Sequence, residues 1–131
     1  MYRVIIAGGR DFQDYSLLQR SMDAFLMNID DDVLIVSGRA KGADRLGERY
    51  ANERGYTVQP YPADWQKHGK AAGFIRNEEM AQNADALVAF WNGESRGTAH
   101  MIKLARQYSL DVRVIIYGGR NQEPYIPNLE R

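Results

Sequence analysis

Glycine-rich turns that carry arginine, lysine and aspartate interrupt this sequence, and three of them directly follow short apolar runs. The clearest is "SGRAKGAD", residues 37–44, which comes after the apolar run Val33–Val36. Glycine lets the backbone bend sharply and approach a ligand closely. A helix that begins after such a turn presents unpaired N–H groups with a partial positive charge, and these bind phosphate readily. The turn therefore predicts part of a phosphate-binding site.

The other turns have a similar composition. "GGRDF", residues 8–12, follows the first apolar run, and "WNGESRGT", residues 91–98, follows the fourth. The third run leads through Pro62 toward a helix that carries Arg76 and Asn77. We expect these segments to converge on one crevice for a nucleotide-derived phosphate, and we assign no catalytic residue. The candidate ligand-binding residues are Gly8, Gly9, Arg10, Asp11, Ser37, Gly38, Lys41, Gly42, Ala43, Asp44, Arg76, Asn77, Gly93, Ser95, Arg96, Gly97 and Thr98.

Arg76 is the strongest candidate among the cations. Arginine can bind a phosphate through two parallel hydrogen bonds, and Met80 would hold the helix of Arg76 against the sheet. Arg39 and Lys41 are equally well explained as solvated surface charges. Asp44 could accept a hydrogen bond from a ribose hydroxyl, or could complement the dipole at a helix start.

Several other side chains have both a functional and a structural interpretation. Asp64 could bind a ligand, or could cap a helix or form a turn. Trp65 and Trp91 could stack on a base or pack against the protein. A structural or exposed role is favoured for His100. The segment 38–42 lacks the Lys-Ser/Thr that completes a P-loop, so a P-loop NTPase is disfavoured.

Five short apolar runs alternate with four longer amphipathic segments. Continuously apolar runs are typical of strands that are covered on both faces of a parallel sheet. We expect strands over residues 2–7, 33–36, 56–61, 86–90 and 112–117, and helices over 16–27, 43–53, 70–82 and 95–108. This alternation predicts a Rossmann-like, doubly wound α/β fold with a mainly parallel five-stranded sheet in the order 3-2-1-4-5, flanked by helices. Its topological switch, where ligands usually bind, lies between the first and fourth strands.

The composition limits the class of protein. We expect one domain over residues 1–118 and an extended C-terminal tail over residues 119–131. Lys+Arg and Asp+Glu each number 17, and this zero net charge argues against binding to duplex DNA or to an anionic membrane. Cysteine is absent and histidine occurs only twice, so no metal site or cofactor is expected. No apolar stretch suits a targeting or membrane segment, so we expect a cytoplasmic protein; a homo-oligomer stays open.

Together, "GGRDF", "SGRAKGADRLGERYA", "PADWQKHGKAAGFIRNEEMA" and "ADALVAFWNGESRGTAHMI" resemble the YspA-type, cpYpsA-related branch of the SLOG superfamily. The resemblance covers residues 2–116. It implies a Rossmann-like sheet with a pocket for a nucleotide or a related molecule. The wider superfamily includes the Lonely Guy phosphoribohydrolases, which cleave nucleoside monophosphates at the N-glycosidic bond, and the DNA-processing protein of transformation.

The Lonely Guy motifs are kept only in part. Arg76 and Met80 keep the spacing of an active-site Arg and Met, and Gly97-Thr98 keeps the G-T pair of P-G-G-x-G-T-x-x-E. Met101 stands at the glutamate position. A carboxylate there would stabilise positive charge or activate water as the sugar–base bond breaks, and methionine does neither. The resemblance therefore implies a phosphate-binding role for Gly97 and Thr98 and a phosphate or sugar contact for Arg76, and does not carry over phosphoribohydrolase catalysis.

Three hypotheses of function follow. The leading one is a module that senses or sequesters a nucleotide-derived phosphate ligand. The alternative is an enzyme that hydrolyses a nucleotide, with Asp11, Asp44 or Glu78 as its acid–base group, and the sequence does not decide between the two. Binding of single-stranded nucleic acid is a second alternative, against which the balanced charge speaks.

Overall fold

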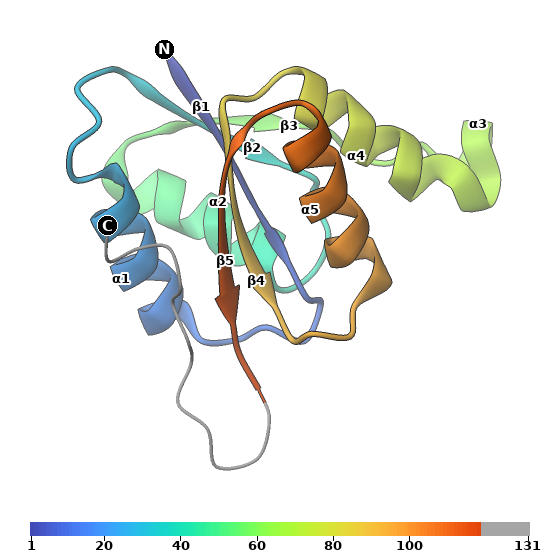
Figure 1. Ribbon diagram of the computed structural model, residues 1–131, viewed down its shortest axis with the longest axis horizontal. Helices are drawn as coiled ribbons and strands as arrows, with labels where there is room; N and C mark the ends of the chain where they lie inside the picture. Colours follow the sequence, from blue (N-terminus) through green and yellow to red (C-terminus); the bar gives the residue numbers. More distant parts are fainter. Residues whose placement is uncertain (119–131) are drawn as a thin grey trace.

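A five-stranded parallel sheet forms the centre of the computed structural model, which describes residues 1–118 (Figure 1). The predicted tail, residues 119–131, lies outside the described residues. The strand order is β3-β2-β1-β4-β5, and every neighbouring pair is parallel. This confirms the predicted Rossmann-like fold and its strand order. The strands are β1 (Tyr2–Gly8), β2 (Val33–Ser37), β3 (Thr57–Pro60), β4 (Ala86–Trp91) and β5 (Asp111–Ile116).

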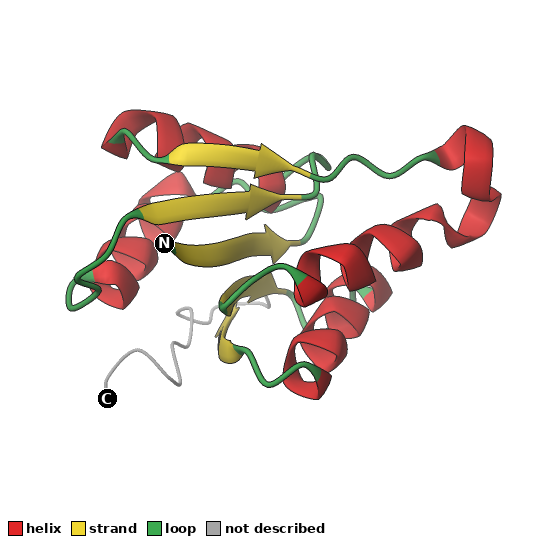
Figure 2. Ribbon diagram, turned by 90° about the horizontal axis from the view of Figure 1, so that it is seen from above, coloured by secondary structure: helices red, strands yellow, loops and turns green. Residues whose placement is uncertain are grey.

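Four helices of eleven or twelve residues cover the two faces of the sheet (Figures 1 and 2). They are α1 (Tyr15–Leu26) and α2 (Ala43–Arg54) on one face, and α4 (Ala72–Gln82) and α5 (Arg96–Gln107) on the other. The helix expected over residues 70–82 begins later than predicted. A one-turn helix, α3 (Trp65–His68), and a 3₁₀ turn (Gly69–Ala71) precede it, because Gly69 adopts φ +55 and ends α3. In Figure 2, α3 lies beyond the arrowheads of the strands.

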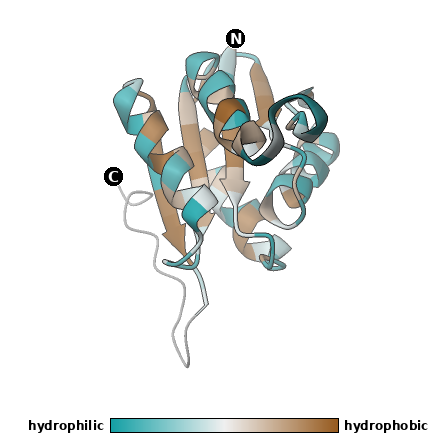
Figure 3. Ribbon diagram, turned by 90° about the vertical axis from the view of Figure 1, so that its right-hand side faces the viewer, coloured by the Kyte–Doolittle hydropathy of each residue, from teal (hydrophilic) through white to brown (hydrophobic). Residues whose placement is uncertain are grey.

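Side chains of each inner strand alternate between two hydrophobic cores. Val4 and Ile6 of β1 pack with the inner sides of α1 and α2, whereas Ile5 and Ala7 pack with α4 and α5. Successive side chains of a strand point to opposite faces, so a continuously apolar strand supplies both cores. Figure 3 shows brown, hydrophobic strands between helices whose outward turns are largely teal. No helix in residues 1–118 is both long and apolar enough to cross a membrane.

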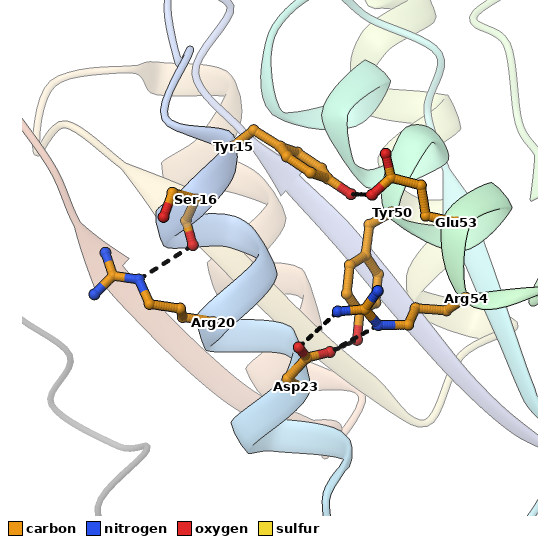
Figure 4. A network of polar contacts seen from close by, with 7 residues as sticks. All are labelled: Tyr15, Ser16, Arg20, Asp23, Tyr50, Glu53 and Arg54. Atoms are coloured by element: carbon orange, nitrogen blue, oxygen red, sulfur yellow. Dashed lines mark hydrogen bonds and ion pairs between the residues drawn. The ribbon is translucent and has the colours of Figure 1, made fainter.

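A polar network joins α1 to α2 on the outer side of the core that these two helices cover (Figure 4). The buried Tyr50 donates from Oη to Asp23 Oδ1 at 2.6 Å, and Arg54 binds the same carboxylate through Nε and Nη2. Tyr15 donates to Glu53 Oε1 at 2.5 Å. The hydrogen bonds from Arg54 lower the pKa of Asp23, so this carboxylate stays ionised and holds α2 in place.

Candidate functional site

The carboxyl ends of β1 and β4 lie side by side, and the chain leaves them toward opposite faces of the sheet. β1 continues to α1 on one face, and β4 continues to α5 on the other. The loops that follow therefore diverge and leave a crevice, as expected at a topological switch point. The turn after β2 and the helix α4 close this crevice from its two sides.

The crevice contains a hollow of about 100 Å³, here called the inner hollow. Residues from β1, from the β2–α2 turn, from α4 and from α5 contribute to it. Its lining consists of Ala7, Gly8, Arg10, Ala40, Asp44, Arg76, Asn77, Met80, Ser95, Gly97, Thr98 and Met101.

A larger hollow of about 490 Å³ adjoins the first and is here called the outer hollow. The two share Arg10, Ala40 and Arg76. The lining of the outer hollow consists of those three residues and Gly38, Arg39, Lys41, Arg45, Pro62, Ala63 and Trp65. Five of the ten lining residues are cations and none is acidic, so a positive potential is expected across this opening although the whole chain is neutral.

Arg76 links the turn after β2 to the start of α5. Its Nη1 donates to the carbonyl oxygen of Gly38, and its Nε donates to Asn77 Oδ1 at 3.0 Å. The buried Asn77 in turn places Nδ2 3.5 Å from the carbonyl oxygen of Gly97 and 3.3 Å from His100 Nδ1. Partial burial lowers the pKa of Arg76, but an arginine remains protonated in proteins. The guanidinium is thus a fixed positive charge between the two hollows.

Asp44 is the acidic residue in the lining of the inner hollow. It is 5% exposed, and its Oδ2 accepts a hydrogen bond from the Ala40 N–H at 3.1 Å. Burial is the largest cause that raises the pKa of Asp44 to about 6, and the Ala40 hydrogen bond and the charge of Arg76 oppose it. A carboxyl group with this pKa exists in both protonation states near neutral pH.

Close backbone packing sets the position of α2 at the crevice. Gly42 has φ +77, and a Cβ atom there would lie 2.2 Å from the carbonyl oxygen of Gly9. The Ala43 N–H donates to that same carbonyl at 3.2 Å. Only glycine combines this left-handed conformation with so near an approach. These two residues therefore position α2 without lining the inner hollow.

Ser95 begins α5 as its N-cap. Its Oγ accepts from the Thr98 N–H at 3.3 Å, and its carbonyl oxygen accepts from the Ala99 N–H at 3.1 Å. The N–H groups of Arg96 and Gly97 precede any intrahelical acceptor. Gly97 lines the inner hollow, so the first turn of α5 brings its free N–H and the positive end of the helix dipole to that hollow.

The structure brings most of the predicted candidates to this site. Gly8, Arg10, Asp44, Arg76, Asn77, Ser95, Gly97 and Thr98 line the inner hollow, and Gly38 and Lys41 line the outer hollow. Gly9, Asp11, Ser37, Gly42, Ala43, Gly93 and Arg96 line neither hollow.

Asp11 and Ser37 have other partners. Asp11 Oδ1 accepts from Tyr117 Oη at 2.5 Å, and Ser37 donates from Oγ to Glu48 Oε2 at 2.6 Å. The carboxylate of Asp11 and burial both raise the pKa of Tyr117, burial more strongly. Both side chains therefore serve the structure of the turns.

Structural roles are found for three of the side chains that the sequence left open. Asp64 caps α3 by accepting from the Lys67 N–H at 3.0 Å, and Trp91 donates from Nε1 to the Ser95 carbonyl oxygen. The ring of His100 lies 4.4 Å from that of Phe74, and burial lowers its pKa. Within residues 1–118, no group of three His, Cys, Asp or Glu residues is placed to hold a metal ion.

Nine residues of the two hollows were not among the candidate ligand-binding residues, although the sequence had suggested Arg39 as a possible cation and Trp65 as a possible stacking residue. They are Ala7, Arg39, Ala40, Arg45, Pro62, Ala63, Trp65, Met80 and Met101. Arg45 could have been found from its position in the first turn after Gly42. Trp65 follows β3, whose carboxyl end lies at the same edge of the sheet as those of β1 and β2. Met101 could have been found from its position three residues after Thr98, because this spacing places both side chains on the same side of α5.

Comparisons with known proteins identify the family of this chain and other proteins with its fold. The profile of the YAcAr family, described as "YspA, cpYpsA-related SLOG family", matches residues 2–68. The Gene 61 protein of Mycobacterium phage D29 is 36% identical over 118 residues, covering 86% of this chain and 94% of that protein.

Two solved structures share the fold. DNA processing protein A from Streptococcus pneumoniae superposes with a TM-score of 0.67 at 16% identity, over 92% of this chain and 52% of that chain. This chain therefore spans about half the length of that protein. The Helicobacter pylori protein of the same name, described for its single-stranded DNA binding mode, gives a TM-score of 0.64 at 20% identity, over 93% of this chain and 68% of that one.

Proposed function

Because this chain belongs to the YspA, cpYpsA-related SLOG family, we propose that it binds a nucleotide or nucleotide-derived ligand through a phosphate in the inner hollow. The observation that carries the proposal is the position of Arg76. Arg76 lines both hollows, and its neighbour Asn77 reaches the start of α5, where Gly97 and Thr98 line the inner hollow. Binding to sense or sequester the ligand, as predicted from the sequence, is the function that this site supports best.

The inner hollow offers a phosphate three kinds of contact. Arg76 and Arg10 supply positive charge, and the first turn of α5 supplies main-chain donors and its dipole. The glycine at position 97 lets a ligand come close to the main chain, since a Cβ there would meet nothing within 4 Å. Charge-assisted hydrogen bonds of this kind are roughly twice as strong as neutral ones.

Turnover of the ligand is less well supported than binding. Met101, at the position of the motif glutamate, is 1% exposed and supplies only apolar surface to the inner hollow. Of the three acidic candidates, Asp11 is bound to Tyr117, and Glu78 lines a separate hollow beside Phe74. Asp44 is thus the acid–base group that a hydrolase would have to use.

Isothermal titration calorimetry with AMP, ADP, GDP, CDP and UDP tests the proposal. We expect Arg76→Ala to weaken nucleotide binding roughly 10- to 150-fold, because it removes charge-assisted hydrogen bonds. Arg106→Ala is the matched control, because Arg106 is an exposed arginine of α5 outside both hollows. Equal weakening by the two substitutions, or no binding of any nucleotide by the natural sequence, would contradict the proposal. Release of free base or ribose phosphate that Asp44→Asn abolishes would instead favour the hydrolase.

Single-stranded nucleic acid is a second candidate, supported by the cations of the outer hollow and by the description of the Helicobacter pylori neighbour. It would place one phosphate in the inner hollow and continue outward along the cations. A labelled oligonucleotide of about 12 nucleotides distinguishes it. Tighter binding than ADP, falling steeply between about 50 and 200 mM salt, would favour nucleic acid. Binding of ADP that the oligonucleotide does not displace would favour the nucleotide.

A further inference from the structure

We propose that the ligand is a nucleoside polyphosphate that spans both hollows, with its base stacked on Trp65 in the outer hollow. This inference rests on the proposed function and adds to it the position of the base and the number of phosphates. The inner hollow then holds the terminal phosphate only, and Trp65 becomes the base-binding residue.

The sizes of the hollows give the first argument. Sites for small molecules usually enclose about 300–1,000 Å³. The inner hollow, at about 100 Å³, is too small for a whole nucleotide, whereas the adjoining outer hollow measures about 490 Å³. Because the two share Arg10 and Arg76, a ligand whose phosphate lies in the inner hollow extends past these side chains into the outer one.

The position of Trp65 gives the second argument. It is 54% exposed and lines the outer hollow, and no other aromatic residue of the described chain lines either hollow. A Cβ atom built on Gly73 would lie 3.7 Å from Trp65 Cη2, so the indole lies beside the first turn of α4 with room for a methyl group between them. A half-exposed indole that lies beside a helix and lines a hollow is suited to stack on a base, and such stacking tolerates any base.

The charges give the third argument. Within residues 1–118, none of Arg10, Lys41, Arg45 and Arg76 has a carboxylate oxygen within 4.0 Å. Arg39 differs, because its Nε lies 3.4 Å from Glu48 Oε2. These four cations without an ion-pair partner carry more positive charge than one phosphate in the inner hollow would neutralise. A second phosphate beside Arg10, Lys41 and Arg45 would complement the charge that remains.

Calorimetry on the full chain with ADP and with inorganic pyrophosphate tests the position of the base. We expect Trp65→Ala to weaken ADP binding roughly 5- to 150-fold, since stacking is lost, and to leave pyrophosphate binding unchanged. Trp65→Phe should restore most of the ADP affinity. Phe74→Ala is the matched control, because Phe74 is also 54% exposed but lines a different hollow. The assignment would be overturned if Trp65→Ala lost the same affinity for ADP and for pyrophosphate. It would also be overturned if Trp65→Ala bound ADP, GDP, CDP and UDP as tightly as the natural sequence does.

The number of phosphates is tested by comparing ADP with AMP. We expect ADP to bind at least about tenfold more tightly, and a Lys41→Ala, Arg45→Ala double variant to reduce this ratio toward one. Equal affinity for AMP and ADP would overturn the polyphosphate assignment. If Arg76→Ala abolishes nucleotide binding while these tests fail, the proposed function stands and this inference does not. If the natural sequence binds no nucleotide, both fail together.

Discussion

Asp44 shows how much the role of one residue depends on its surroundings. In the sequence it is an acidic residue in the first turn of a helix, where a carboxylate usually lies in solvent and complements the dipole. In the structure it is 5% exposed, and its carboxyl group lines the inner hollow beside Arg76. The groups that act on its charge are Arg76 and Arg10, which favour the ionised form, and Glu48, which opposes it. Burial outweighs them, so the pKa rises to about 6.

The raised pKa of Asp44 leads to a prediction for stability without ligand. The folded protein holds this proton more tightly than the unfolded chain, whose carboxyl has a pKa near 3.8. The contribution of Asp44 to the free energy of unfolding is therefore fully present below about pH 4 and is lost as the pH rises through 6. In Asp44→Asn the side chain stays neutral, and its Oδ1 can still accept from the Ala40 N–H.

We expect the free energy of unfolding of Asp44→Asn, relative to the natural sequence, to increase by roughly 1–3 kcal/mol between pH 4 and pH 8. Urea unfolding at several pH values measures this difference. A difference that is the same at every pH would show that Asp44 titrates normally in the folded protein.

The start of α2 is the element on which the geometry of the site most depends. Gly42 and Ala43 hold α2 against the carbonyl oxygen of Gly9, and through it the turn after β1 meets the turn after β2. These residues bind no ligand in our proposal, yet they place Asp44 and Arg45 beside the two hollows. A substitution here should affect folding and the site together.

We expect Gly42→Ala to lower the free energy of unfolding by at least about 3 kcal/mol, because a Cβ atom would lie 2.2 Å from a backbone oxygen that cannot yield. Gly55→Ala, at the other end of the same helix, is the control. Its φ is nearly the same, +76 against +77, but its ψ of +21 is the αL conformation that other residues can adopt, whereas Gly42 has ψ −124. A Cβ atom at Gly55 would meet nothing within 4 Å. Gly55→Ala should cost only about 1–2 kcal/mol for the left-handed conformation. Equal losses in chemical denaturation would mean that neither the contact with Gly9 nor the ψ angle of Gly42 requires a glycine there.

At the scale of the molecule, one sheet divides two cores that share every inner strand. α1 and α2 pack on one face and α4 and α5 on the other. Each core therefore needs strands whose other face belongs to the second core. The site lies at the edge where the two layers meet, and residues from both layers line the inner hollow. Cooperative folding of the two layers therefore keeps the site assembled.

This arrangement predicts one unfolding transition. Leu18→Ala in α1 and Leu104→Ala in α5 remove buried side chains from opposite faces, and each should lower the free energy of unfolding by about 2–5 kcal/mol. Far-ultraviolet circular dichroism and tryptophan fluorescence should report the same midpoint for each variant. Separate midpoints for the two signals would show that the layers unfold independently.

The sequence alone determined the strands, four main helices and the order of the sheet. Local signals carry these features: apolar runs such as Val33–Val36 require cover on both faces, and helical spacing shows which sides of the helices are buried. The crossover rule then restricts the topology. The glycine-rich turns were predictable as a group for the same reason, because strand ends of a parallel sheet meet at one edge.

Only the tertiary structure decided which polar residues of those turns face the crevice. Asp11 and Asp44 stand in similar turns, but one is bound to Tyr117, 106 residues away in the chain, and the other is buried in the lining of the inner hollow. The same holds for Trp65, whose indole lies beside Gly73 of α4 and lines the outer hollow. Side-chain direction and burial depend on contacts between segments far apart in sequence, and neither composition nor periodicity encodes these contacts.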